Sequence, residues 1–218
     1  MHRFNDIEFQ WLGHDGFRIV GNGKIVYVDP YQLTNIQQNN NDADILLISH
    51  NHYDHLSIID IKNVITKKTS VVAAEECIEQ IKGLNVKEIK GVKPGDKLTI
   101  QNVSIEILPA YNENKKFHPK ADAKVGFVFT INKHRIYHAG DTDIIPEMKS
   151  ANADIVLVPV SGTYVMTAEE AAKAVNELIK PKKIAIPMHY GTIIGSEKDA
   201  ERFRELVNVC ETKILQRE

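Results

Sequence analysis

Residues 45–55 read Ile45-Leu46-Leu47-Ile48-Ser49-His50-Asn51-His52-Tyr53-Asp54-His55. The apolar run at the start is typical of a short buried strand. The polar end, H-x-H-x-D-H, places four metal-seeking side chains directly after that strand. Because side chains two residues apart project to the same side of an extended chain, His50 and His52 can face one ion. Asp54 and His55, which enter a turn, can face a second ion. The segment therefore predicts half of a two-metal site.

Two further candidate ligands follow predicted strands later in the chain. Asp141 comes after the predicted strand 135–138, and His189 comes after the predicted strand 183–188. In open sheets flanked by helices, sites gather outside the strand ends, where loops converge. Asp141 has one carboxylate oxygen for each of two ions and could bridge them. Two ions about 3.5–4 Å apart lower the pKa of a shared water, so this ligand set predicts hydrolytic chemistry.

Each of these side chains also has a structural alternative. The histidines of 50–55 could hydrogen-bond to the backbone of a polar turn, although isolated histidines do not cluster in this way. Asp141 could cap a turn or the segment after it. Asp29, in an Asp-Pro pair after a predicted strand, could start a turn or orient the metal loop. His14, beside Gly13, could contribute to a pocket or only to the turn.

The remaining sequence predicts a mixed sheet with helical crossovers. Hydrophobic runs joined by hairpin signals such as Gly21-Asn22-Gly23 indicate antiparallel pairs, and other runs are separated by helical patterns. Predicted strands cover residues 7–12, 17–20, 25–28, 44–48, 70–73, 97–100, 103–108, 126–131, 135–138, 155–158 and 183–188. Predicted helices cover residues 57–66, 167–180 and 196–209. Thr167 and Glu170 form a predicted capping box. The polar run 37–42 is expected to be a surface loop.

Composition narrows the class of protein. The 218 residues suffice for one large domain, and we expect a single domain over residues 1–218. The formal net charge of -2 leaves no basic footprint for nucleic acid or an anionic membrane. No stretch reaches the about 20 apolar residues that span a bilayer, and the N-terminus lacks the features of a signal peptide. Cys77 and Cys210, both interpreted as helical, indicate free thiols in a reducing cytoplasm.

Taken together, the motifs resemble the metallo-β-lactamase superfamily, in particular its small branch of metal-dependent hydrolases. The resemblance covers nearly the whole chain. The stretches that carry it are Trp11-Leu12-Gly13-His14, Val28-Asp29-Pro30, His50-Asn51-His52-Tyr53-Asp54-His55, Ala139-Gly140-Asp141-Thr142, Gly162-Thr163-Tyr164-Val165-Met166-Thr167 and Pro187-Met188-His189-Tyr190-Gly191. The resemblance implies an α/β fold, a four-layer αβ/βα sandwich of two mixed sheets, with a dinuclear site at the edge of the sheets.

The resemblance also implies a role for each matching residue. The implied ligands are His50 and His52 for the first ion, Asp54, His55 and His189 for the second ion, and Asp141 as the bridge between them. Asp29 would orient the histidine loop through hydrogen bonds behind the ligands.

One ligand of the family pattern is missing from its usual place. The family takes a further ligand for the first ion from a histidine between the first motif and the aspartate. The corresponding strand end here reads Leu108-Pro109-Ala110-Tyr111-Asn112, without a histidine. The nearest histidine is His118, and we expect it to reach the first ion. The alternatives are a loop histidine that contacts substrate or is merely exposed, which would leave the first ion with fewer protein ligands.

The predicted function is a cytoplasmic metal-dependent hydrolase that uses a metal-bound hydroxide on an ester, lactone or phosphodiester-type small substrate. Asp54 would orient or receive the proton. The expected cofactors are two divalent ions. Nitrogen and carboxylate ligands without thiolate suit Zn, while Mn, Fe and Ni also fit. Tyr164 and Tyr190 could donate hydrogen bonds to substrate or pack as aromatic residues.

Three other functions remain open, and the narrowest, an activity on a lipid or sugar phosphate, is implied only by the resemblance. A nucleic-acid phosphodiesterase would share the metals, but the sequence has no basic cluster beyond Lys67-Lys68 and Lys115-Lys116. A non-catalytic metal-binding protein is the second alternative, and the displaced histidine is its best support. The expected partner is a small-molecule substrate, and neither nucleic acid nor a membrane is expected to be one.

Overall fold

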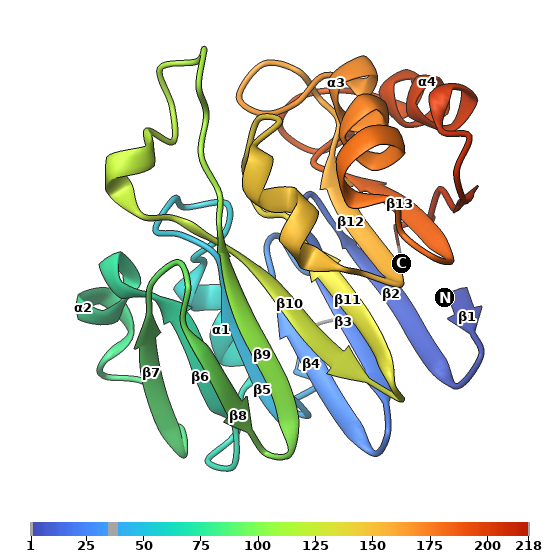
Figure 1. Ribbon diagram of the computed structural model, residues 1–218. Coiled ribbons are helices and arrows are strands. Elements are labelled where there is room, and N and C mark those ends of the chain that lie inside the picture. The colour runs from blue at the N-terminus through green and yellow to red at the C-terminus, as the bar shows by residue number, and fades with distance from the viewer. Residues whose placement is uncertain (1, 35–38, 218) are drawn as a thin grey trace.

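Two seven-stranded sheets form the centre of the computed structural model, which describes residues 2–34 and 39–217 (Figure 1). The first sheet contains, in spatial order, β1 (His2–Phe4), β2 (Ile7–Gly13), β3 (Gly16–Gly21), β4 (Lys24–Val28), β5 (Ile45–Ile48), β6 (Ser70–Ala74) and β7 (Glu88–Val92). The second contains β8 (Lys97–Ile100), β9 (Val103–Pro109), β10 (Val125–Ile131), β11 (His134–His138), β12 (Ile155–Pro159), β13 (Ile184–Met188) and β14 (Glu211–Thr212).

Both sheets follow the same topology. Strands β1 to β4 pair antiparallel, and β4 to β7 run parallel. In the same way, β8 to β11 pair antiparallel and β11 to β14 run parallel. Because parallel strands all end at the same edge of a sheet, the loops after β4 and β5 share one edge, as do the loops after β11, β12 and β13. The sequence shows no internal repeat, so this repetition of topology is visible only in the structure.

Helices cover the outer faces of the two sheets (Figure 1). The α-helices are α1 (Ile58–Val64), α2 (Ile78–Ile81), α3 (Ala168–Lys173) and α4 (Glu197–Leu206), and the 3-10 helices are η1 (Glu75–Cys77), η2 (Lys120–Asp122) and η3 (Pro146–Ala151). Helix α3 continues into a π-helical segment, η4 (Ala174–Ile179). Strands β5, β6, β12 and β13 are buried along their whole length, as expected for parallel strands covered on both faces. The predicted four-layer αβ/βα sandwich with two mixed sheets is confirmed.

The largely aliphatic core includes phenylalanines from both sheets. Phe9, Phe17, Phe127 and Phe129, which come from strands of both sheets, are fully buried. Phe17 of β3 packs edge-on against the ring of His138 at the end of β11, with 5.9 Å between ring centroids. This contact joins the first sheet to the second next to the loop that carries Asp141.

The three strands that sequence patterns did not predict are β1, β7 and β14, and all three are edge strands. Edge strands are short and partly polar because one side lacks a neighbour, so their hydrophobic alternation is weak. The strands with clear patterns, which include every strand that carries a predicted ligand, were predicted within a few residues of their observed ends.

The helix predictions need two corrections. The capping box of Thr167 and Glu170 is present at the start of α3. Helix α4, however, ends at Leu206 and not at residue 209, because the side chain of Asn176 accepts from Asn208 N and donates to the carbonyl of Leu206. Cys210 therefore lies outside the helix, which contradicts its helical interpretation.

Part of the predicted polar loop 37–42 lies outside the described residues, which resume at residue 39. None of the helices in the described ranges has the length and apolar character that crossing a bilayer requires.

Candidate metal centre

Four loops meet at one edge of the sandwich and bring all the predicted ligands together. They are the β5–α1 loop with His50, His52, Asp54 and His55, the β9–η2 loop with His118, the loop after β11 with Asp141, and the loop after β13 with His189. The atoms that could bind an ion form two main groups. The first ligand group is His50, His52, His118 and Asp141, and the second ligand group is His14, Asp54, His55 and His189.

In the first ligand group the imidazole nitrogen atoms of the three histidines converge on one point. His50 Nε2 lies 3.0 Å from His52 Nδ1, which lies 3.2 Å from His118 Nε2. Asp141 Oδ2 lies 3.2 Å from His118 Nε2. Tetrahedral ligands at about 2.0–2.1 Å from a zinc ion are about 3.3 Å from one another, so these separations suit a shared ion. His118 is buried in this cluster, which excludes the alternative of an exposed loop histidine.

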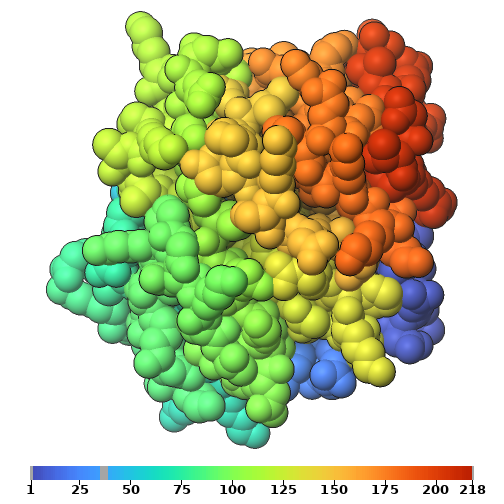
Figure 2. Space-filling view, viewed as in Figure 1, coloured from blue at the N-terminus to red at the C-terminus, as the bar shows by residue number. Residues whose placement is uncertain are grey.

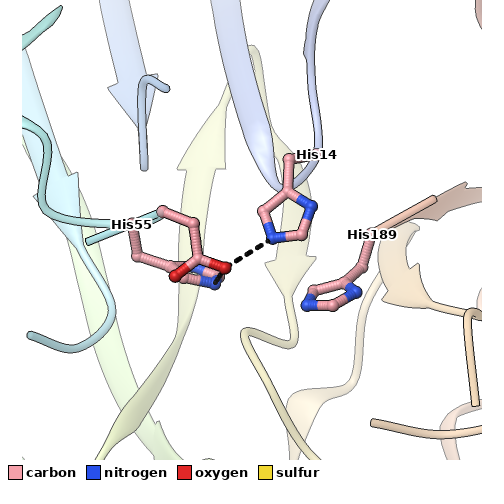
Figure 3. A group of neighbouring side chains, drawn as sticks. His14, His55 and His189 are labelled. Carbon is pink, nitrogen blue, oxygen red and sulfur yellow. Dashed lines mark hydrogen bonds and ion pairs between the residues drawn. The ribbon is translucent and has the colours of Figure 1, made fainter. Parts of the chain in front are cut away.

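The second ligand group lies on the other side of Asp141. His55 Nε2 is 3.4 Å from Asp141 Oδ1, and His189 Nε2 is 3.4 Å from Asp141 Oδ2. Figure 3 shows His14, His55 and His189 converging from separate elements. The dashed line in that view runs from His14 to the neighbouring carboxylate, which belongs to Asp54.

The carboxylate of Asp141 reaches both ligand groups. Its Oδ2 faces His118 of the first ligand group and also His189 of the second. Its Oδ1 points to His55 and has no hydrogen-bond partner within the described ranges. Asp141 Oδ2 therefore lies between the two groups, and Oδ1 lies beside the second.

Asp29 fixes the histidine loop from behind, as the sequence predicted. Its carboxylate accepts hydrogen bonds from the Ser49 amide at 2.8 Å, from Ser49 Oγ and from His55 Nδ1 at 2.9 Å. Because Ser49 Oγ donates to Asp29, it can accept from His50 Nδ1, 2.9 Å away. With both Nδ1 atoms carrying protons, the Nε2 lone pairs of His50 and His55 face the centre of the site.

Two of the other ligand histidines, His118 and His189, are also held from behind, by residues that the sequence did not single out. Ser161 Oγ, from the loop after β12, lies 2.8 Å from His189 Nδ1. The Asn112 amide donates to the carbonyls of Phe117 and Tyr164. The side chain of Asn112 also lies 3.2 Å from His118 Nδ1. Asn112 therefore fixes the His118 ring both directly and through the backbone of the neighbouring residues. Neither contact could be predicted from the sequence. Ser161 is far from His189 along the chain, and Asn112 is an ordinary loop residue.

His14 acts on Asp54 and does not line the pocket. Burial lowers the pKa of His14 to about 4, so the ring is neutral near pH 7. Its Nε2 lies 3.1 Å from Asp54 Oδ2 and must carry the proton of this hydrogen bond. Burial alone would raise the pKa of Asp54, but the bond from His14 and the nearby His55 outweigh it and lower that pKa. Asp54 is therefore a carboxylate, oriented by a neutral histidine.

Asp141 is a buried anion at the centre of the site. Burial would raise the pKa of Asp141, but His189 and His55 outweigh it and hold that pKa well below the usual value. Burial would lower the pKa of His55, but Asp141 and Asp29 outweigh it and hold that pKa well above the usual value. Burial lowers the pKa of His50 well below the usual value. A buried carboxylate surrounded by imidazoles is a donor set that divalent metal ions bind when those imidazoles give up their protons.

Unpartnered buried atoms show that the residues fit a metal. His55 Nε2 and Asp141 Oδ1 are buried and have no hydrogen-bond partner in the part of the chain that the structure describes. Such atoms carry a desolvation cost of about 1–3 kcal/mol each when nothing satisfies them. Divalent ions within the two ligand groups would satisfy both atoms, so the donor set fits the cofactors that the sequence predicts.

Asp15 is a site residue that the sequence reasoning missed. Its side chain is fully buried, and its Oδ2 lies 3.8 Å from His55 Nδ1. With His55, Asp141 and His189 it forms a third set of converging ligand atoms. Burial and the neighbouring carboxylate of Asp141 raise the pKa of Asp15 well above its usual value. The only signal in the sequence is that Asp15 follows Gly13-His14 in a turn, which gave no reason to prefer a buried position.

Four residues of the site have left-handed backbone conformations that side chains other than glycine seldom adopt. The φ angles are 51° for His14, 40° for Asp29, 58° for His118 and 60° for His189. Each costs about 1–3 kcal/mol and persists only where other contacts fix it, a pattern found at functional sites. The contacts at His14 are clear, since its carbonyl accepts from Trp11 Nε1 at 2.9 Å and from His189 N at 3.0 Å.

A pocket of about 430 Å³ opens above the two ligand groups, and His52, Asp54, His118, Asp141 and His189 line it. Tyr164 also lines this pocket, whereas Tyr190 is buried and stacks on Trp11 with 4.7 Å between ring centroids. The substrate-contact alternative therefore suits Tyr164, and the packing alternative suits Tyr190.

Comparison with known proteins agrees with this geometry. A family model described as a beta-lactamase superfamily domain matches residues 8–189. A Staphylococcus aureus protein named UPF0173 metal-dependent hydrolase is 29% identical over 225 residues, which cover 96% of each chain. A Parabacteroides distasonis crystal structure, described as that of a proposed metal-dependent hydrolase, is 31% identical with a TM-score of 0.83 and covers 96% of this chain and 94% of that one.

A more distant structure supports the fold alone. Igni18, a metallo hydrolase from Ignicoccus hospitalis, is 21% identical with a TM-score of 0.76 and covers 96% of this chain and 95% of that one. Two seven-stranded sheets with histidines and aspartates converging at one edge define the metallo-β-lactamase class of fold. This chain belongs to the β-lactamase superfamily domain family and stands among its metal-dependent hydrolases.

Proposed function

We propose that this chain hydrolyses a small-molecule substrate with two divalent metal ions bound by the residues of the two ligand groups. His50, His52 and His118 would hold one ion, Asp54, His55 and His189 the other, and Asp141 would contact both. The observation that carries the proposal is the position of Asp141 Oδ2, within 3.2 Å of His118 Nε2 and 3.4 Å of His189 Nε2. A carboxylate within reach of two sets of imidazoles can contact both ions of a metal pair.

When bound, such a metal pair supplies Lewis acidity and lowers the pKa of water to near neutrality. The residues of the chain supply orientation. Asp54, which accepts a hydrogen bond from His14, faces the pocket. It could orient the attacking water or accept a proton from it. Asp29 and Ser161 hold His55 and His189 from behind, which keeps their Nε2 atoms directed inward.

The donor set narrows the identity of the metal. Five histidines and two aspartates, without a thiolate, form the proposed ligands, and zinc suits such a set. Manganese, iron and nickel also fit nitrogen and carboxylate donors, so elemental analysis of the purified protein is part of the test.

The size and lining of the pocket favour a small ester, lactone or phosphodiester-type substrate over a nucleic acid. A volume of about 430 Å³ lies within the range of about 300–1,000 Å³ typical of small-molecule sites. A nucleic-acid phosphodiesterase would need cationic side chains along the path of the backbone. We also propose a reducing compartment such as the cytoplasm, because Cys77 and Cys210 are both free thiols.

The proposal is tested by metal analysis combined with turnover of ester, lactone, thioester and phosphodiester probes. Wild-type protein should contain about two equivalents of divalent metal and turn over at least one probe class. The double variant Asp54→Ala/His55→Ala should keep the fold and lose turnover. His134→Ala, at the other end of β11 from the site, is the matched control and should retain both metal and turnover. Turnover by the double variant equal to that of wild type would refute the proposal.

A further inference from the structure

The walls of the pocket above the ligand groups are apolar. Besides the proposed ligands, the residues that line it are Asn51, Tyr53, Phe117, Tyr164 and Ile193. We refer to Tyr53, Phe117, Tyr164 and Ile193 as the apolar mouth. Asn51 is the one other side chain in this wall, so the space beyond the ligands offers few polar partners to a substrate.

The apolar mouth is exposed to an unusual degree for this protein. Five large apolar side chains are exposed in the described part of the chain, and Tyr53, Phe117 and Ile193 are three of them. Their exposed fractions are 67%, 49% and 38%. Single exposed apolar residues are common, but a cluster around one pocket marks a binding site.

The loops that form the apolar mouth are the loops that position the ligands. Tyr53 lies between His52 and Asp54, Phe117 directly precedes His118, and Ile193 follows His189 in the loop after β13. Tyr164 belongs to the loop that also carries Ser161, the partner of His189. Apolar walls and ligands are therefore fixed together, and a group bound in the mouth lies beside the metal centre.

Aromatic pairs stiffen two sides of the mouth. Phe117 and Tyr164 meet edge to face with 4.9 Å between ring centroids, and Tyr53 meets Tyr31 edge to face with 5.9 Å between centroids. The segment between β9 and η2, which carries Phe117, stands out at the upper edge of the molecule in the space-filling view (Figure 2). Edge-to-face pairs are a favourable aromatic geometry, so these side chains form a defined wall.

Cationic side chains are absent from the described lining of the pocket. Lys115, in the same loop as Phe117, is paired with Asp143 and lies 3.7 Å from Glu170. Lys124 is buried and paired with Glu76 at 2.9 Å. A phosphate or carboxylate group away from the reacting bond would find no counter-ion among the residues that line the pocket, and its burial against apolar walls would be costly.

From these observations we infer that the substrate is a neutral carboxylic ester or lactone whose acyl group is an apolar chain or ring, bound in the apolar mouth. The inference rests on the proposed hydrolytic function and narrows its substrate class. In the reaction, the oxygen of water forms a bond to the acyl carbon, and the bond from that carbon to the alcohol oxygen breaks. The alcohol takes one proton of the water, the second proton passes to solvent, and the acid leaves as a carboxylate.

Binding of neutral ketones to the metal-loaded protein tests the inference without turnover. Acetophenone, butyrophenone and hexanophenone carry a carbonyl that cannot be hydrolysed and differ only in apolar length. Their Kd values, from ligand-observed NMR titration, should fall about two- to fourfold for each added methylene. The terminal-hydroxyl analogue of hexanophenone should bind more weakly than hexanophenone. Equal Kd values across the series would overturn the inference.

Substitutions in the mouth give the matched comparison. Phe117→Ala and Ile193→Ala should weaken the binding of hexanophenone by about fivefold or more and change that of acetophenone little, because only the longer chain reaches those side chains. Phe117→Leu should restore much of the affinity. Ile59→Ala is the control, since Ile59 is 79% exposed and does not line the pocket. If Ile59→Ala weakened hexanophenone as much as Phe117→Ala, the mouth would not be the binding site.

Turnover of matched probes separates failure of the inference from failure of the proposed function. The values of kcat/KM should rise from 4-nitrophenyl acetate to the butyrate and the hexanoate, and should exceed the value for bis(4-nitrophenyl) phosphate. Turnover of the phosphodiester with no dependence on acyl length would refute the inference and leave the hydrolase intact. Length-dependent binding of ketones without turnover of any probe would refute the hydrolase and leave the apolar binding site.

Discussion

The ring of His14 donates a hydrogen bond to the carboxylate of Asp54 across 3.1 Å, which joins the turn between β2 and β3 to the histidine loop after β5. The carbonyl of His14 also accepts from His189 N at 3.0 Å. One residue thus positions two proposed ligands of the second ion, from loops that are far apart along the chain. This explains why a buried histidine holds a left-handed conformation at that turn.

Replacing His14 by Ala should weaken the second ion selectively. The loss of an outer hydrogen bond to a metal ligand typically lowers metal affinity about 10–100-fold, so His14→Ala should retain about one equivalent of metal after dialysis. His14→Gln keeps a side-chain N–H donor and should retain more metal than His14→Ala. Elemental analysis and chelator competition measure both variants. Two tightly bound ions in His14→Ala would show that His14 serves only the turn.

Replacing His118 by Asn should weaken the first ion. Asn tolerates the left-handed backbone that His118 adopts, so the substitution removes the imidazole and not the loop conformation. Metal affinity at the first ion should fall by more than about 100-fold, beyond the effect typical of an outer partner. His134→Ala should leave metal content unchanged. If chelator competition gave wild-type affinity for His118→Asn, the three remaining residues of the first ligand group would suffice.

Gly140→Ala should destabilise the protein more than Gly23→Ala. Both glycines have positive φ angles, 63° and 66°, so an Ala at either position costs about 1–2 kcal/mol in backbone strain. A Cβ at Gly140 would also lie 2.9 Å from the carbonyl of Val125, whereas a Cβ at Gly23 meets nothing within 4 Å. The clash should add about 1–3 kcal/mol. Urea unfolding of the two variants measures the difference, and equal losses would show that the Asp141 loop relaxes freely.

Removal of metal should lower the melting temperature. Ions that bind the folded state at about 1,000 times their Kd stabilise it by about 4 kcal/mol. For a chain of this size that corresponds to about 8–16 °C in Tm. Calorimetry with and without a chelator, followed by restoration with zinc, measures the change. Identical melting temperatures would mean that no ion occupies the buried donors of His55 and Asp141.

The ligand loops were predictable because their signals are local. The run from Ile45 to His55 joins a buried strand to four candidate ligands within a few residues, and Asp141 and His189 each follow a strand with a clear hydrophobic pattern. His118 was predicted from a resemblance, and its loop position alone did not show that it is buried. Asp15 and Ser161 had no comparable signal, because each acts on a histidine that is distant in sequence, and Asn112 is an ordinary loop residue.

The pattern of apolar and polar residues along the chain was enough to determine which strands are buried. It also showed which of them end in metal-seeking side chains, because both features can be read from neighbouring residues. Only the tertiary structure decided that a single oxygen of Asp141 lies between both groups of histidines, that His14 holds Asp54, and that Tyr53, Phe117 and Ile193 surround one pocket. These relationships depend on how the two sheets are brought face to face. The hydrophobic pattern along a strand fixes which side is buried and leaves the position of that strand relative to the opposite sheet undetermined.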